Sequence, residues 1–305
     1  MTASPTLLLI SLLLVLSYSA AAAAAPRKLV LVQQPPLVLK YHNGPLLRGN
    51  YTLSLLFYGR FSAAQRSIVA DFIRSLSPSG ASPQPPSAAS WWRTTARYGG
   101  GSAVHLSLGL QLLDVSYSKG KLLSSSDVVA LATGAAAASG PRAIAVVVTA
   151  ADVAVEGFCS SRCGTHGRLE GSAGFVWVGD SASQCPGQCA WPFHQPLYGP
   201  QTPPLVSPNG DVGMEGVVIN LATLLAGAAT NPDGRGYFQG PADAPLEAVT
   251  ACTGVFGSGA YPGYPGKVLV DPTTGANYNA RGLAGRKYLL PAMWDPSTSQ
   301  CSTLV

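Results

Sequence analysis

The first half of the chain contains a stretch with the hydrophobic pattern of a buried strand, followed by one with the pattern of an amphipathic helix. Residues 51–58 (YTLSLLFY) are almost entirely aromatic or apolar, which predicts a buried strand. In residues 63–76, Ile68, Phe72 and Leu76 recur at four-residue spacing, and Ser62 is a favoured residue at a helix start. We therefore expect a strand-then-helix unit over residues 51–76.

The remaining apolar segments predict three further strands and two further helices. The expected strands are residues 104–110, 143–149 and 175–178. The expected helices run from Ser126-Asp127 through the alanine run to Gly140-Pro141, and over residues 213–229 before Asn231-Pro232-Asp233-Gly234. Residues 77–90, rich in proline and serine, are expected to form a loop, and Trp91-Trp92 to begin the next ordered segment. This mixture indicates a single α/β, or mixed α+β, globular domain.

The N-terminus has the pattern of a secretory signal peptide. Its apolar core, Leu7 to Leu16, is about ten residues long, which is too short to cross a bilayer as a helix. The small residues Ala20–Ala25 follow it and predict cleavage near Ala25. Residues 1–25 are thus expected to be removed, leaving a domain over residues 26–305 with no membrane span. Asn50-Tyr51-Thr52 is a sequon and predicts N-glycosylation at Asn50.

All the cysteines lie in the second half of the chain, which is otherwise expected to be rich in loops after residue 234. They are Cys159, Cys163, Cys185, Cys189, Cys252 and Cys301. An even number of cysteines in an exported chain implies disulfides, which would restrain such loops. The first four cluster and could pair among themselves, which leaves Cys252–Cys301 as one predicted bridge.

The two Cys-x3-Cys pairs, with His166 and His194 close by, also have spacings that a structural zinc site accepts. The oxidising compartment favours disulfides over zinc, and no cofactor is expected.

Positive charge is concentrated in the first half of the mature chain. Residues 27–121 hold eleven Lys/Arg against two acids, whereas residues 122–305 hold eight against twelve. Outside a cell, such a basic half favours an acidic polysaccharide as partner over nucleic acid. The pair Trp91-Trp92, with Arg93 and Arg97 beside it, is the candidate contact, because aromatic faces stack on sugars. Scattered solubility charge is the alternative interpretation.

The chain shows no complete catalytic motif. Gly179-Asp180-Ser181 resembles the nucleophile block of the Gly-Asp-Ser lipases, but that family has an Asp-x-x-His near its C-terminus, and the last histidine here is His194. No His-Glu-x-x-His occurs, and the four histidines (His42, His105, His166 and His194) are scattered. Carboxylate pairs for glycoside hydrolysis cannot be recognised without geometry. The prediction therefore leans against an enzyme and assigns no catalytic or metal-binding residue.

Several longer blocks identify a family resemblance. They include 41–47 (YHNGPLL), 55–61 (LLFYGRF), 163–167 (CGTHG), 184–193 (QCPGQCAWPF), 208–213 (PNGDVG) and 285–291 (GRKYLLP). The chain resembles the plant EXORDIUM, or phosphate-induced protein, family from about Tyr41 to Val305. The resemblance implies a protein of the apoplast or cell wall, associated with brassinosteroid-responsive growth, cell expansion and adjustment to carbon status. It implies no established reaction.

A second resemblance concerns the segment 220–232 (NLATLLAGAATNP). It is similar to a microbial segment of the form Ser-His-Glu-Leu-x-Glu-Ala-x-Thr-Asp-Pro, which looks like a zincin active-site helix. In that alignment the His-Glu pair falls on Thr223-Leu224 and the later glutamate on Gly227, none of which can bind zinc or activate its water. The resemblance implies a zincin-like scaffold that has lost its metal site.

Three functional hypotheses follow. The first is a secreted, non-catalytic cell-wall protein that promotes growth, acting through an acidic wall polysaccharide or an extracellular receptor. The second is a pectin-binding module, and the third is a hydrolase of wall polymers or peptides. A cleft with converging carboxylates, or one that brings His166 and His194 together, would favour the third.

Overall fold

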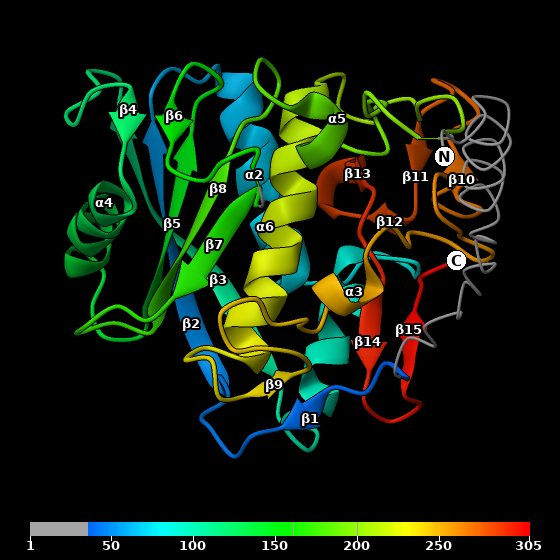
Figure 1. Ribbon diagram of the computed structural model, residues 1–305, viewed down its shortest axis with the longest axis horizontal. Coiled ribbons are helices and arrows are strands. Elements are labelled where there is room, and N and C mark those ends of the chain that lie inside the picture. Colours follow the sequence, from blue (N-terminus) through cyan, green and yellow to red (C-terminus); the bar gives the residue numbers. More distant parts are fainter. Residues whose placement is uncertain (1–35, 161, 200) are drawn as a thin grey trace, which may run out of the picture. The chain divides into compact units, whose positions relative to one another are not determined.

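A five-stranded sheet with the order β3-β2-β5-β8-β7 organises the fold (Figure 1). The computed structural model describes residues 36–160, 162–199 and 201–305, so the predicted signal peptide lies outside the described residues. The strands are β2 (Gly49–Tyr58), β3 (Val104–Asp114), β5 (Ala143–Thr149), β7 (Gly164–Gly167) and β8 (Gly174–Gly179). The first four strands in the sheet order are mutually parallel, and β7 runs antiparallel at one edge.

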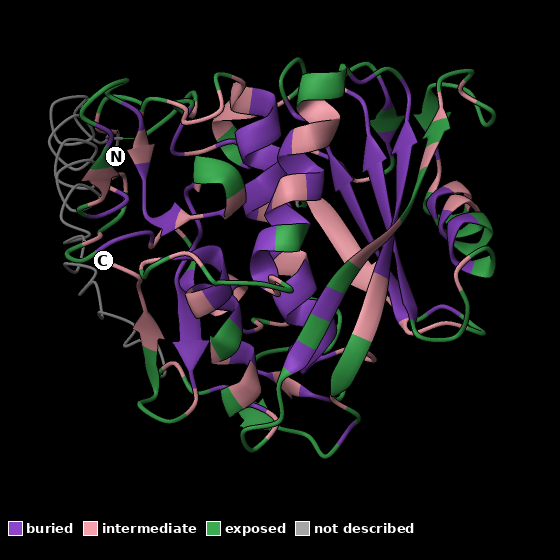
Figure 2. Cartoon of the chain, turned by 180° about the vertical axis from the view of Figure 1, so that it is seen from behind, coloured by how far each residue is buried: buried purple, intermediate pink, exposed green. Residues whose placement is uncertain are grey.

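Helices cover both faces of this sheet. Helix α4 (Ser125–Ala137) lies on one face, and α2 (Ala63–Leu76) and α6 (Val212–Thr230) lie on the other (Figure 1). Each begins at a side-chain cap: Ser62 for α2, Ser124 for α4 and Asp211 for α6. Because crossovers place helices on both faces, β5 and β8 are buried along their whole length, as Figure 2 shows.

Helix α6 is the apolar centre of the second half of the chain. It alone among the described helices is long and apolar enough to cross a membrane, yet 78% of that window is buried inside the protein. It packs against β7, β8 and α2, and 15 of its 19 residues are buried. Burial on all sides explains its apolar sequence as that of a core helix.

Short elements complete the chain. The remaining helices are α3 (Ala88–Trp92), α5 (Pro186–Cys189), η1 (Arg93–Arg97), η2 (Thr250–Cys252) and η3 (Leu283–Gly285). The remaining strands form two-stranded pairs: β1 (Lys40–Tyr41) with β9 (Tyr237–Phe238), β4 (Leu122–Leu123) with β6 (Ala154–Val155), β10 (Leu269–Val270) with β11 (Asn277–Tyr278), β12 (Ala280–Arg281) with β13 (Lys287–Tyr288), and β14 (Met293–Asp295) with β15 (Gln300–Ser302).

Three disulfides restrain the second half. They are Cys159–Cys185, Cys163–Cys189 and Cys252–Cys301. The predicted bridge Cys252–Cys301 is confirmed, and the four clustered cysteines pair among themselves as expected. The zinc alternative is wrong because no cysteine in the described residues is free. Cys163 directly precedes β7, so its bridge ties the edge strand to α5.

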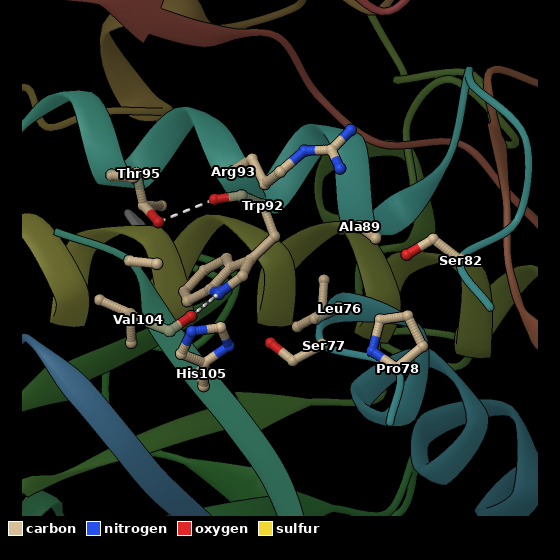
Figure 3. A pocket seen from close by; sticks show the side chains of 12 residues that line it. Leu76, Ser77, Pro78, Ser82, Ala89, Trp92, Arg93, Thr95, Val104 and His105 are labelled. Atoms are coloured by element: carbon tan, nitrogen blue, oxygen red, sulfur yellow. Dashed lines mark hydrogen bonds between the residues drawn. The ribbon is translucent and has the colours of Figure 1, made fainter. Parts of the chain in front are cut away.

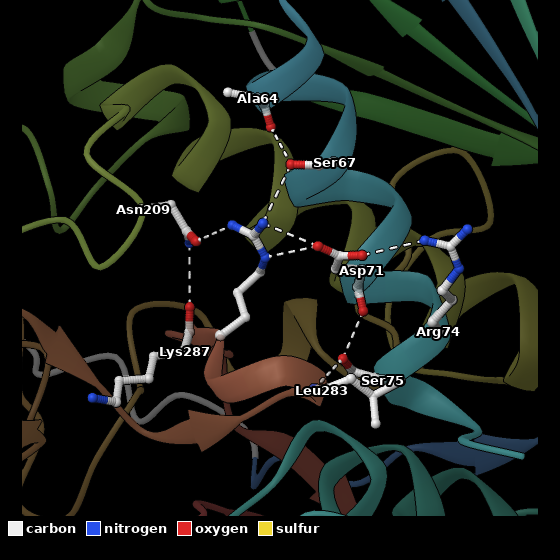
Figure 4. A network of polar contacts seen from close by, with 9 residues as sticks. Ala64, Ser67, Asp71, Arg74, Ser75, Asn209, Leu283 and Lys287 are labelled. Carbon is white, nitrogen blue, oxygen red and sulfur yellow. Dashed lines mark hydrogen bonds and ion pairs between the residues drawn. The ribbon is translucent and has the colours of Figure 1, made fainter. Parts of the chain in front are cut away.

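A polar network joins the C-terminal segment to α2 and to Asn209, just before α6 (Figure 4). Arg286 contacts Asp71 of α2 at 3.0 Å and donates to Asn209 Oδ1 at 2.8 Å. Asn209 in turn donates to the Glu215 carboxylate through its backbone N–H (2.8 Å) and its side chain (3.0 Å). Burial raises the pKa of Glu215 to about 7.

The predicted α/β class is confirmed, and each predicted strand and helix overlaps an observed one. Two details differ. The expected loop 77–90 already turns helical at Ala88, where Ser87 and Ser90 form a capping box. The loop-rich C-terminal half also contains the short strand pairs, whose two- and three-residue lengths leave no periodic signal.

Candidate functional site

A pocket of about 700 Å³ opens between the edge strand β7 and the segment that follows α6. Strand β7 forms one wall, and residues 231–234 and 242–247 form the other. The lining residues with ionisable side chains are Arg162, His166, Arg168, Asp233, Asp243 and Glu247. The volume lies in the range of small-ligand sites.

His166 and Glu247 meet on the wall of this pocket. The ring Nε2 of His166 lies 3.1 Å from Glu247 Oε1 and 2.9 Å from Oε2. Because a carboxylate only accepts, Nε2 carries the hydrogen. Asn231 Nδ2 donates to Glu247 Oε1 at 2.7 Å, so the carboxylate is held from two sides. Both side chains are 12% exposed, so the pair is largely shielded but still reaches the pocket.

Two glycines allow this close packing. A Cβ at Gly227 of α6 would lie 2.6 Å from Glu247 Oε2 and 2.7 Å from His166 Nε2. At Gly164 of β7, a Cβ would lie 2.3 Å from the carbonyl oxygen of Trp177 and 2.6 Å from Leu224 of α6. Any side chain at either position would therefore push the helix, the strand and the His–Glu pair apart.

The rim of the pocket carries further charges. Asp233 pairs with Arg235 at 2.6 Å and lies 4.0 Å from Arg168, whose side chain is 75% exposed. Arg162 and Arg168 flank β7 at its two ends, and both are exposed. Asp243 is exposed on the opposite wall. The rim is thus mixed in sign, with cations beside the strand and a carboxylate across from it.

Among the described residues, the histidine of this site is not arranged as the base of a nucleophilic triad. His166 Nδ1 is buried, and no hydrogen-bond partner is present for it among the described residues. No serine, threonine or cysteine side chain in those residues hydrogen-bonds to the ring, so no side-chain nucleophile is paired with His166 there. The aligned zincin positions offer Leu224 and Gly227 to this region, which fit no metal.

The other predicted catalytic candidates do not come together. Ser181 is fully buried, and its hydroxyl has no partner in the described part of the chain. His194 bonds to the Gln195 carbonyl and His42 stacks on Phe238, so neither contacts Ser181. His166 and His194 do not share the pocket. The lipase interpretation is therefore not supported by the geometry.

The prediction that Trp91 and Trp92 form an exposed contact surface for sugars is wrong. Trp91 and Trp92 are 2% and 3% exposed, and their indole N–H groups donate to the carbonyls of Pro291 and Val104. Figure 3 shows the Trp92 ring turned inward toward Val104 beside a small pocket of about 160 Å³. The cause is the α3 helix, which directs both indoles into the core. Arg93 is exposed, and Arg97 forms an ion pair with Asp295.

The predicted glycosylation site has a suitable position. Asn50 is exposed near the start of β2, opposite His105 of β3. Glycosylation itself stays a prediction.

Sequence reasoning found His166 but missed its partners. Glu247 lies in an irregular segment, and Asn231 was recognised only as the end of α6. The cue that could have marked the pocket is the alignment that placed Gly227 where a zincin has a glutamate.

Comparison with known proteins gives the family. Residues 39–304 match the family model described as the phosphate-induced protein 1 conserved region. Protein EXORDIUM-like 2 of Arabidopsis thaliana is 61% identical over 284 residues, covering 90% of this chain and 92% of that protein. Protein PHOSPHATE-INDUCED 1 of Nicotiana tabacum is 56% identical, covering 90% and 91% of the two chains. Protein EXORDIUM of Arabidopsis thaliana is 54% identical, covering 88% and 90%. No solved structure gives a significant match. The chain belongs to the EXORDIUM, or phosphate-induced protein, family.

Proposed function

We propose that this protein is secreted into the plant apoplast, where it promotes cell expansion by binding an extracellular ligand in the His166–Glu247 pocket. The observation that carries the proposal is the pocket itself. It joins a restrained His–Glu–Asn cluster to an accessible, charged rim. Among the described residues, no Ser, Thr or Cys side chain hydrogen-bonds to the histidine ring. Such an arrangement recognises polar groups and positions them.

The disulfides support the extracellular address. Three disulfides account for all six cysteines, a pattern typical of exported proteins. The signal-peptide pattern of residues 1–25 and the accessible Asn50 agree with this address. Brassinosteroid-responsive growth and carbon-status adaptation are proposed on the family resemblance.

The arrangement of α6 supports a binding role on a zincin-like scaffold. In the alignment, metal-ligand positions fall on Thr223 and Gly227 and the general-base position falls on Leu224. Here Leu224 lines the pocket and Gly227 packs beneath His166 and Glu247. We infer that a former metal centre has become a ligand pocket. His166 and Glu247, which come from other elements, now supply its polar groups.

A growth assay with rim variants tests the proposal. Arg168→Glu reverses an exposed charge on the pocket rim, 4.0 Å from Asp233. Arg48→Glu makes the same change on an exposed residue outside the pocket. Each variant, and the wild type, would be expressed in plants whose own copy is disrupted. We expect wild type and Arg48→Glu to restore cell length and Arg168→Glu to restore it poorly.

Protein in apoplastic washes is measured in the same plants, so that secretion and activity are separated. Equal secretion with equal growth for all three proteins would refute the pocket function. Retention of the wild-type protein inside cells would refute the extracellular address.

A further inference from the structure

The outer edge of β7 faces the pocket with backbone groups that no described strand pairs. Among them the His166 carbonyl accepts a hydrogen bond from the Thr165 hydroxyl of the same strand, at 3.3 Å. The only strand partner of β7 in the described residues is β8, in the register Gly164↔Val178, Thr165↔Trp177, His166↔Val176 and Gly167↔Phe175. One position earlier, Gly179 N–H donates to the Cys163 carbonyl at 3.3 Å. Antiparallel pairing alternates bonded and non-bonded residues, so the backbone groups of Gly164 and His166 face away from β8.

This edge lacks the usual protection against pairing with another chain. Natural edge strands are blocked by lysine, proline, bulges or a covering element. Strand β7 is GTHG, carries none of these blocking residues, and is half-exposed at all four positions. The Cys163–Cys189 bridge anchors its start, so the edge is held in place before any ligand arrives.

The pocket provides space for another strand beside this edge. A neighbouring strand lies about 4.8 Å away, and four residues of it span roughly 13 Å. All four residues of β7 line the pocket, and the opposite wall is formed by residues 231–234 and 242–247. Side chains of an added strand would alternate, with every second one directed toward His166, Glu247 and Asn231.

We propose that the ligand of this pocket is an extended peptide segment that adds as a strand to the free edge of β7, with backbone hydrogen bonds to Gly164 and His166. This rests on the proposed function, because it names the class of ligand for the same pocket. A saccharide would leave the row of backbone groups on β7 largely unmatched. The pocket also offers no exposed aromatic face among its lining residues for a sugar ring.

The proposal is tested with a phage-displayed library of random heptapeptides, panned on the folded, secreted protein. Captured peptides are synthesised and measured for binding to wild type, Arg168→Glu and Arg48→Glu. Hydrogen exchange of the protein is then followed by NMR with and without peptide. We expect the amides of Gly164 and His166 to exchange at least tenfold more slowly in the complex. Those of Thr165 and Gly167, already paired to β8, should change little.

N-methylation of the peptide provides the matched control on the ligand side. Methyl groups on alternate peptide amides should reduce affinity at least tenfold, and methyl groups on the intervening amides should be tolerated, because only alternate N–H groups face β7. Peptides that bind in the pocket without slowing exchange at Gly164 and His166 would overturn strand addition.

Oligogalacturonides serve as the second probe and separate the two proposals. If these sugars bind, Arg168→Glu abolishes their binding and no peptide is captured, the peptide proposal is overturned and the proposed pocket function stands. If growth depends on Arg168 but no peptide is captured, the peptide proposal is likewise overturned and the pocket function stands. If growth does not depend on Arg168, the pocket function itself fails.

Discussion

His166 donates from Nε2 to the carboxylate of Glu247 at 2.9 Å, although 81 positions separate the two residues in the chain. Strand β7 supplies the histidine, and the segment after α6 supplies the glutamate. Helix α6 lies beneath both and approaches them through Gly227. The pair therefore forms only when the sheet edge, the core helix and the C-terminal half pack together correctly.

Replacement of Gly227 by alanine should disrupt this pair. The added Cβ would stand within 2.7 Å of both side chains, and overpacking of this kind costs about 1–3 kcal/mol. Gly134 in α4 is the matched control, because a Cβ there meets nothing within 4 Å. Gly134→Ala should stabilise the protein by about 0.5–1 kcal/mol, since alanine favours helix. Urea unfolding of both variants measures the contrast, and equal midpoints would contradict it.

Residues 51–76 show what the sequence can predict. Six of the eight residues Tyr51–Tyr58 are aromatic or apolar, and α2 has a regular apolar stripe with a capping serine. Local pattern and tertiary burial therefore agree. The apolar character of α6 likewise indicates a buried helix.

The candidate site could not be predicted in the same way. Strand β7 contains two glycines and no alternation, and it becomes a strand only because β8 pairs with it. Glu247 is placed by the fold of an irregular segment, which no local pattern encodes. Trp91 and Trp92 illustrate the opposite error. Their sequence context suggested an exposed sugar-binding surface, whereas tertiary packing buries both side chains in the core.

Stability should fall as pH rises through the range in which Glu215 titrates. Its pKa is raised from 4.5 to about 7 by burial, so the folded state retains a proton that the unfolded chain releases. The contribution of Glu215 to the free energy of unfolding is fully present below pH 4.5. It is lost as the pH rises to about 7, and the loss amounts to about 3 kcal/mol.

Glu215→Gln keeps an acceptor for Ser207 and Asn209 and cannot titrate. Unfolding free energies at pH 4.5, 6 and 7.5 should decline less for this variant than for wild type. If the free energy of unfolding declines with pH equally in the two proteins, Glu215 does not cause the pH dependence of stability.

Loss of the Cys163–Cys189 bridge should affect ligand binding more than loss of Cys252–Cys301. Both double Cys→Ser variants should lose roughly 3 kcal/mol of stability, because the bridges close loops of 26 and 49 residues. Only the first bridge anchors β7. Captured peptides should therefore bind the Cys163→Ser/Cys189→Ser protein several-fold more weakly than the other variant, by calorimetry at a temperature where both are folded. Equal affinities of the two variants would show that β7 keeps its position without the Cys163–Cys189 bridge.

Arg286 should contribute more stability than Arg74, although both contact Asp71. Arg74 forms an exposed pair at 3.2 Å, a type that contributes at most about 0.5 kcal/mol. The Arg286 side chain is 25% exposed and also bonds to Asn209, which in turn donates to the Glu215 carboxylate. Removing its side chain leaves Asn209 Oδ1 without this donor and Asp71 without its inner partner. Arg286→Ala should therefore cost about 1–3 kcal/mol. Urea unfolding of the two alanine variants at pH 6 compares them, and a larger loss for Arg74→Ala would contradict the bracing role of Arg286.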